Sequence, residues 1–146
     1  MTRCVYIASA ERQVGKSAIA LGVLELFARQ VRSVGFFRPL VPSLEDDGVT
    51  RALLANDSKA RQTHDESVGV SYEQWADDQN AAIDTIVARY SALAERHDAV
   101  VILGSDFTDL STSTELDHNA IIAANLNAPV IHVCRAAGRA PEEVRR

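Results

Sequence analysis

Gly15, Lys16 and Ser17 are the residues of this sequence whose types and spacing could do chemistry. They follow the apolar run 4–8 and precede a helical pattern that begins at residue 18. A strand that leads through a tight loop into a helix directs backbone N–H groups and the positive end of the helix dipole at one point, which favours an anion. In such loops the lysine reaches phosphate oxygens and the serine hydroxyl binds Mg²⁺. The segment therefore predicts a phosphate or nucleotide site, with ATP, ADP or NADH as candidate ligands and Mg²⁺ as the metal.

The loop departs from the usual glycine-rich pattern. Gly-x₄-Gly-Lys-Ser/Thr requires glycine at position 10, where this sequence has Ala10. Arg12 also lies inside the loop, where the backbone should approach a ligand closely. The alternative interpretation is a loop that keeps the architecture of a phosphate-binding loop and binds no nucleotide.

Phosphoryl chemistry also needs a carboxylate that holds the metal, usually at the end of the neighbouring strand. The apolar run 99–103 predicts that strand, and Asp106 and Asp109 follow it. Asp106 is therefore the candidate Mg²⁺ ligand together with Ser17. The alternative is that both aspartates only cap turns before the next helix.

Strands and helices must alternate to position these residues. Apolar runs bounded by Gly, Pro, Asp or Ser predict buried strands, and a periodicity near 3.6 residues predicts helices between them. The first helix is expected to pack through Ile19, Val23, Phe27 and Val31, with Ala20 and Leu24 beside them. This alternation predicts an α/β fold, a parallel sheet flanked by helices on both faces. The strands are expected at 4–8, 34–37, 99–103 and 130–134, and the helices at 18–31, 80–97 and 114–127.

The segment 42–75 carries weaker signals. It predicts a short helix over 50–55, an edge strand over 67–70 and a capping box from Ser71 to Gln74. The polar stretches 45–48 and 56–66 are expected to be loops over the carboxyl ends of the strands, where ligands bind in open α/β sheets.

Length and composition bound the class of protein. With 146 residues, 47% hydrophobic and 24% charged, the chain is typical of one soluble globular domain. No apolar stretch approaches the roughly 20 residues of a membrane span, and no secretory signal precedes the first strand, so a cytoplasmic protein without a membrane partner is expected. A net charge of −5 argues against nonspecific nucleic-acid binding. Cys4 and Cys134 are expected to be buried and unpaired, and the four histidines have no metal-ligand spacing.

The last residues predict a helix that starts and does not continue. Pro141, Glu142 and Glu143 suit a first helical turn, yet the sequence stops at Arg146. We therefore expect residues 1–146 to be a single P-loop-like α/β domain, C-terminally truncated and excised from a longer polypeptide.

Several segments together resemble the N-terminal domain of long-form bacterial phosphate acetyltransferases, which is itself similar to dethiobiotin synthetase and other deviant P-loop ATPases. The resemblance covers nearly the whole chain and is more specific than Gly-Lys-Ser alone. It implies a deviant P-loop NTPase-like, three-layer α/β/α fold with strand order 34–37, 99–103, 4–8, 130–134. The segments are Tyr6-Ile-Ala-Ser9, Val14-Gly-Lys-Ser17, Gly35-Phe-Phe-Arg-Pro39, Ser67-Val-Gly-Val-Ser-Tyr72, Val100-Val-Ile-Leu-Gly-Ser-Asp106 and 119–133.

The resemblance implies a parent enzyme that interconverts acetyl-CoA plus phosphate with acetyl phosphate plus CoA in acetate metabolism. A separate C-terminal acetyltransferase domain would carry the reaction, while this domain would serve regulation and the stability of a homo-oligomer, with no catalytic residue of its own. Arg38 stands where the ATPase relatives have a phosphate-binding lysine, which makes it a candidate phosphate ligand. Leu103 stands where they have a metal-binding glutamate. The alternatives are an ATP-dependent ligase of the dethiobiotin synthetase type and a partner-binding P-loop adaptor without chemistry.

Overall fold

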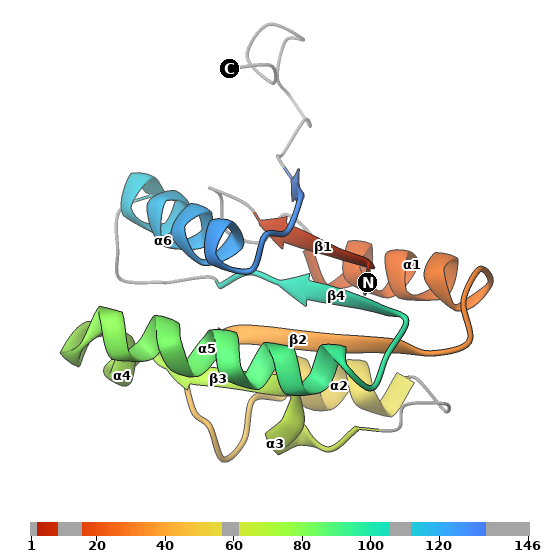
Figure 1. The fold of residues 1–146 in the computed structure, drawn as a ribbon, viewed down its shortest axis with the longest axis horizontal. Coiled ribbons are helices and arrows are strands. Elements are labelled where there is room, and N and C mark those ends of the chain that lie inside the picture. Colours follow the sequence, from red (N-terminus) through yellow and green to blue (C-terminus); the bar gives the residue numbers. More distant parts are fainter. Residues whose placement is uncertain (1–2, 9–15, 57–61, 106–111, 134–146) are drawn as a thin grey trace, which may run out of the picture.

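A computed structural model describes residues 3–8, 16–56, 62–105 and 112–133 (Figure 1). Their strands form one parallel sheet in the order β3-β2-β4-β1-β5. The strands are β1 (Arg3–Ala8), β2 (Val34–Val41), β3 (Val68–Ser71), β4 (Ala99–Leu103) and β5 (Val130–His132). The helices are α1 (Lys16–Ala28), α2 (Gly48–Asn56), α3 (His64–Ser67), α4 (Tyr72–Asp77), α5 (Gln79–Ala94) and α6 (Thr112–Asn125).

The order of the strands confirms the expected sheet. β4 lies between β2 and β1, and β5 pairs with the other side of β1. The edge strand expected near residues 67–70 is β3, which pairs in parallel with β2. Because β1 and β4 are parallel neighbours, their carboxyl ends lie at the same edge of the sheet.

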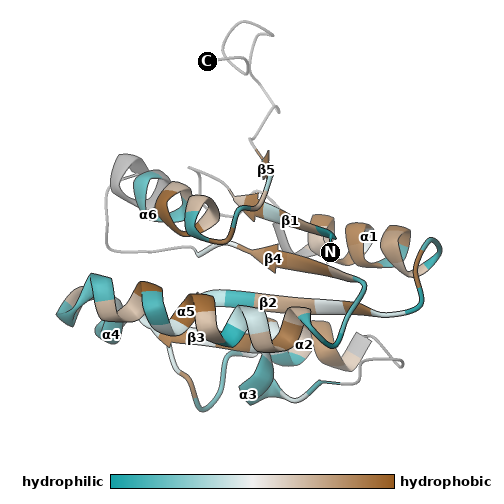
Figure 2. Ribbon diagram, viewed as in Figure 1, coloured by the Kyte–Doolittle hydropathy of each residue, from teal (hydrophilic) through white to brown (hydrophobic). Residues whose placement is uncertain are grey.

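Buried apolar residues form a core on each face of the sheet, which confirms the three-layer α/β/α fold. The central strand β4 and much of α1 are coloured as hydrophobic in Figure 2. One core packs α5 and α6 against the sheet through residues such as Phe37, Ile86 and Ile122. The other packs α1 and α2 through Ala20 and Leu53. None of the helices in the described part of the chain has the length and apolarity needed to cross a membrane.

The pairing of β4 with β1 and with β2 shows which residues lie side by side at the carboxyl edge of the sheet. Ile7 of β1 lies beside Leu103, the last residue of β4. Phe37 of β2 lies beside Ile102, so Arg38 is level with Leu103. Arg38 therefore reaches the edge of the sheet at which β1 and β4 end.

Helix α1 begins and ends earlier than the expected range 18–31. The N–H groups of Gln30 and Val31 both donate to the carbonyl of Phe27, which closes the turn after the helix. Ala20 and Leu24 are buried, whereas Ile19 is 36% exposed. The expected stripe was therefore wrong at Ile19, because the face centred on Ala20 and Leu24 lies against the sheet, and at Val31, because α1 ends at Ala28.

Two short helices begin with capping boxes. The expected box of Ser71 and Gln74 is confirmed at the start of α4. The expected loop 56–66 was wrong in part, because Thr63 and Glu66 form a second box that starts α3. Both boxes satisfy backbone N–H groups that a helix start leaves without partners.

The strand expected at 130–134 was predicted to be buried, but it is largely exposed. Val130 is 50% exposed and Ile131 is 42% exposed, so β5 is not a buried strand. The reason is that, among the described residues, β5 is the outermost strand and pairs with β1 alone. Cys4 is a free thiol and only partly buried, and Cys134 lies outside the described residues.

Candidate functional site

The structure describes one of the predicted ligand-binding side chains, Arg38. Gly15 and Asp106 lie outside the described residues, and so do the side chains of Lys16 and Ser17. Lys16 is the first residue of α1, so β1 leads into a helix at the carboxyl edge, as the sequence predicts. The phosphate and Mg²⁺ roles of these residues stay predictions.

Arg38 is buried in an ion pair with Asp47. Its Nη1 lies 2.6 Å from Asp47 Oδ1, and the two side chains are 5% and 4% exposed. The Nε–H of Arg38 is also buried and has no hydrogen-bond partner among the described residues. Arg38 therefore gives one of its donors to a carboxylate, and at least one other donor finds no acceptor in the described part of the chain.

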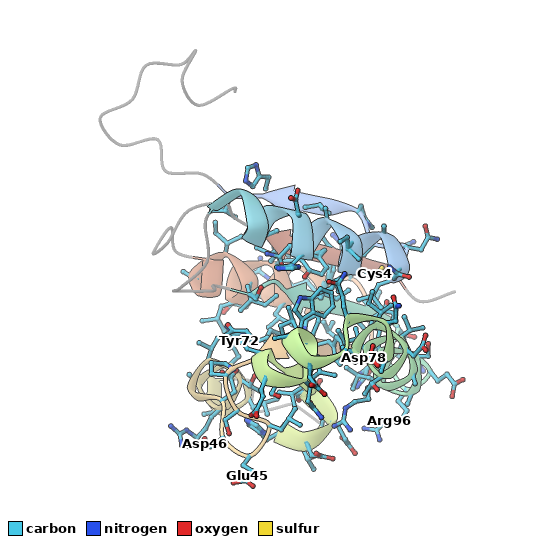
Figure 3. All side chains as sticks on the ribbon, turned by 90° about the vertical axis from the view of Figure 1, so that its left-hand side faces the viewer. Cys4, Glu45, Asp46, Tyr72, Asp78 and Arg96 are labelled. Atoms are coloured by element: carbon cyan, nitrogen blue, oxygen red, sulfur yellow. The ribbon has the colours of Figure 1, made fainter. Side chains whose placement is uncertain are left out.

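Asp47 joins three elements at this edge. Its Oδ2 accepts from the backbone N–H of Thr50 at 3.0 Å and from the Thr50 hydroxyl at 2.6 Å, so it caps the first turn of α2. Its own N–H donates to Nε2 of His64, the first residue of α3. Glu45 and Asp46, by contrast, project outward from the molecule (Figure 3).

The charge of Asp47 is stabilised although the group is buried. Burial alone would raise the pKa of this carboxyl, but the Arg38 charge and the Thr50 hydrogen bonds outweigh it, and the pKa lies below its usual value. Asp47 is therefore a carboxylate at neutral pH, and the site around Arg38 is close to electrically neutral.

Sequence reasoning missed Asp47 as a partner of Arg38. The residue was assigned to a polar loop, and the expected helix 50–55 began too late for Asp47 to be its cap. The available signal was the spacing Asp47-x-x-Thr50, which is typical of an aspartate that caps a helix. Its pairing with Arg38 depends on how α2 packs against β2.

A second buried cluster lies where β1 and β4 end. The Tyr6 hydroxyl donates to Asn119 Oδ1 at 2.7 Å, and the N–H of Ser105 donates to the same oxygen at 3.2 Å. A Cβ on Gly104 would lie 2.8 Å from that oxygen and 3.0 Å from the Ile7 carbonyl oxygen. Asn119 thus fastens the middle of α6 to the strand ends, and a side chain at position 104 would force Asn119 or the neighbouring strand to shift.

The Tyr6 hydroxyl is a hydrogen-bond donor at neutral pH. Burial raises its pKa well above the usual range, and the nearby Arg38 charge opposes this only in part. Within the described residues, no three His, Cys, Asp or Glu side chains are grouped to hold a metal ion. What the described residues offer at this edge is one buried guanidinium.

Comparison with known proteins identifies the family. The sequence model of the AAA domain matches residues 3–144 of the chain. The chain belongs to the AAA domain family. Two relatives are phosphate acetyltransferases. The enzyme of Nitratidesulfovibrio vulgaris is 32% identical to this chain over 99% of its length, and that of Synechocystis sp. is 29% identical over 94%. In both, the match covers 21% of the relative, so the chain spans about a fifth of their length.

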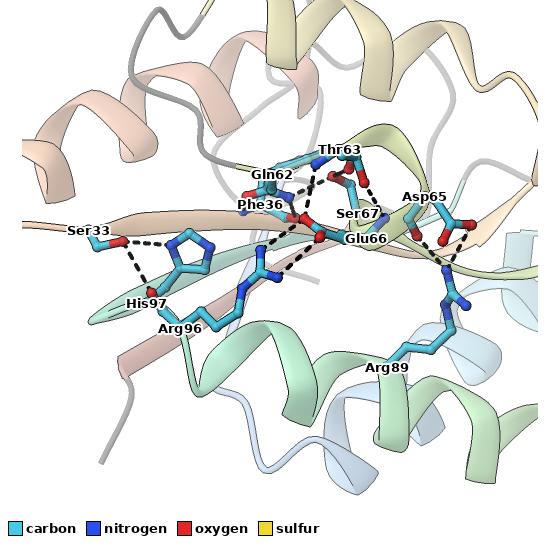
Figure 4. A network of polar contacts seen from close by, with 10 residues as sticks. All are labelled: Ser33, Phe36, Gln62, Thr63, Asp65, Glu66, Ser67, Arg89, Arg96 and His97. Carbon is cyan, nitrogen blue, oxygen red and sulfur yellow. Dashed lines mark hydrogen bonds and ion pairs between the residues drawn. The ribbon is translucent and has the colours of Figure 1, made fainter.

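The AAA domain also has a hollow at the opposite edge of its sheet, where β2 and β4 begin. The hollow has a volume of about 660 Å³. No sequence signal predicted it, because its walls come from three separate segments before β2, around α3 and after α5 (Figure 4). The lining residues are Ser33, Gln62, Thr63, Glu66, Arg96 and His97.

The polar groups around this hollow bind one another. Glu66 accepts from two nitrogens of Arg96, at 3.1 and 2.8 Å, and from the N–H of Thr63. The Ser33 hydroxyl lies 2.7 Å from Nδ1 of His97, whose pKa is lowered, chiefly by burial. Opposite charges in the wall are therefore already paired, which is typical of a structural network.

The side-chain amide of Gln62 hydrogen-bonds to the backbone of Phe36 as a neighbouring strand would. Its Oε1 accepts from the N–H of Phe36 at 2.9 Å, and its Nε2 donates to the Phe36 carbonyl at 2.6 Å. The same Nε2 donates to the Ser67 hydroxyl. β3 begins opposite Arg38, so the Gln62 amide takes the place beside β2 that a longer β3 would fill.

Proposed function

We propose that this AAA domain is a regulatory and assembly domain of a phosphate acetyltransferase. In this proposal it works beside an acetyltransferase domain in the same longer chain, within a homo-oligomer in the cytoplasm. The observation that supports it is the match of nearly the whole domain to about a fifth of two phosphate acetyltransferases. The remaining four fifths of such a relative leave ample length for a separate catalytic domain.

We further propose that the domain binds a phosphate-bearing ligand at the carboxyl edge of its sheet, through Gly15, Lys16, Ser17 and Arg38. Support comes from the level of Arg38, which follows the last residue of β2 that pairs with β4 and is therefore level with the end of β4. Support also comes from the start of α1 at Lys16, because helix N-termini favour anions. With Mg²⁺, Ser17 and Asp106 would be the metal ligands.

The 146-residue chain should not transfer acetyl groups by itself. No turnover above the uncatalysed background is expected when CoA and acetyl phosphate are mixed with the purified chain, because the proposal assigns the reaction to another domain. As a control, the chain should replace the matched segment of the Nitratidesulfovibrio vulgaris enzyme with acetyl transfer retained. Acetyl transfer by the purified chain alone would contradict the assignment of the reaction to a separate domain.

Ligand binding should raise the melting temperature. A ligand at 100 times its dissociation constant stabilises the folded state by about 2.7 kcal/mol, which corresponds to roughly 5 to 10 °C for a domain of this size. Lys16→Ala should abolish the rise observed with ATP, ADP or NADH and Mg²⁺, and should leave the unliganded melting temperature nearly unchanged. If none of the three nucleotides at millimolar concentration shifts the wild-type transition, the nucleotide site is refuted.

A further inference from the structure

The ion pair of Arg38 and Asp47 has a feature that a purely structural pair would not need. A guanidinium can donate to two oxygens at once through its planar fork. Arg38 uses Nη1 on one oxygen of Asp47, while its buried Nε–H has no partner among the described residues. A buried donor without an acceptor is costly, and the described residues supply none for this N–H, which leaves it open to a bound anion.

Asp47 is placed to respond when such an acceptor arrives. Its Oδ1 faces Arg38, while its Oδ2 caps Thr50 in the first turn of α2. Its backbone N–H is held by His64 of α3. If the ion pair of Arg38 breaks, the movement of Asp47 therefore affects α2 through the carboxylate and α3 through the backbone N–H.

We propose that Asp47 is an internal counter-anion of Arg38, and that a phosphate-bearing ligand must displace it to bind. This inference rests on the anion site proposed above and adds its regulation. In the free protein, Asp47 neutralises Arg38 and lowers the affinity for anions. In the bound protein, the ligand takes the Arg38 donors, including Nε–H, and Asp47 is left as a helix cap without its cation.

Two consequences distinguish this arrangement from a simple basic site. The affinity for an anion is set by competition with Asp47, so removal of the carboxylate charge tightens binding. The first turn of α2 loses part of its anchorage to β2 when the ligand binds, so its backbone amides exchange faster in the bound state. Ligand binding is in this way transmitted to the surface formed by α2.

The test uses metal-free sodium tripolyphosphate as the probe in isothermal titration calorimetry. Asp47→Asn should bind it at least tenfold more tightly than the wild type, because asparagine keeps the cap and loses the charge. The matched control is Asp46→Asn, which makes the same change in net charge at an exposed neighbour and should stay within twofold of the wild type. Adding Arg38→Gln to Asp47→Asn should remove the gain.

A second variant and a second measurement guard against misfolding. Asp47→Ser also keeps a capping oxygen, and both neutral variants should show a larger rise in melting temperature with tripolyphosphate than the wild type. Hydrogen exchange at Thr50 and Arg51 should accelerate on ligand binding in the wild type only. Equal or weaker binding by both neutral variants, with a wild type that binds, overturns this inference and leaves the anion site standing. No binding by any variant overturns both.

Discussion

Substitution of Arg38 by methionine is expected to lower the free energy of unfolding by about 3 to 5 kcal/mol at neutral pH. The substitution keeps an unbranched apolar stem of similar shape to that of arginine and removes the charged guanidinium. Asp47 then stays buried, with its side chain 4% exposed, without the cation that compensates its desolvation. Chemical denaturation at pH 7 measures the effect, and Arg51→Met is the control, because the Arg51 pair with Asp46 is exposed and should change stability by less than about 1 kcal/mol.

The free energy of unfolding of the Arg38→Met variant should depend on pH differently from that of the wild type. In the wild type, Arg38 and Thr50 outweigh burial and lower the pKa of Asp47, so its contribution is present above about pH 4 and is lost as the pH falls through that lowered pKa. Without Arg38, burial raises the pKa of Asp47. As the pH falls below neutral, Asp47 of the variant becomes protonated, and the cost of burying its charge is removed. The stability difference between the two proteins should therefore shrink from pH 7 to pH 4. A constant difference over this range would show that Asp47 is not the group responsible.

Gly69→Ala is expected to destabilise the fold by about 3 kcal/mol, near the upper end of the usual cost of overpacking. A Cβ at Gly69 would collide with the carbonyl oxygen of Pro39 and lie 3.1 Å from the Pro39 carbonyl carbon and Cα. These are backbone atoms of β2, so the clash cannot be relieved by a rotamer change, and β3 must move away from β2. Thermal unfolding followed by circular dichroism should show a clearly lowered midpoint.

Gly22→Ala provides the matched comparison for the same chemical change. Gly22 lies in α1, and a Cβ there would meet no atom within 4 Å. Alanine is the better helix former by roughly 0.8 to 1 kcal/mol, so this variant should be slightly more stable than the wild type. Similar losses in both variants would contradict the packing of β3 on β2.

Periodicity and apolar runs predicted the sheet well because they report burial directly. The runs 4–8 and 99–103 became β1 and β4 with little change, since both are flanked by strands and covered on both faces. Burial at β5 was mispredicted, because Val130 and Ile131 read as interior residues, whereas β5 is the outermost strand of the described part of the chain, and nothing local in the sequence shows that position. Helix α3 was missed because one turn is too short to show a period.

The candidate site was predictable only in its local part. Arg38 could be found because it follows an apolar strand and matches a position in related ATPases. Asp47 could be recognised as a helix cap, but its pairing with Arg38 depends on the packing of α2 on the sheet. The walls of the hollow near His97 come from segments far apart in the chain, and no spacing rule joins them.

The Gln62 amide has a consequence for how this protein behaves in crowded solution. Wherever a strand lacks a neighbour, its open N–H and C=O groups are a template on which another chain can pair and start aggregation. β2 would present such a template at Phe36, below the point where β3 begins. Because Gln62 fills both hydrogen-bonding positions of Phe36, another chain cannot pair with β2 at this residue unless it displaces the Gln62 amide.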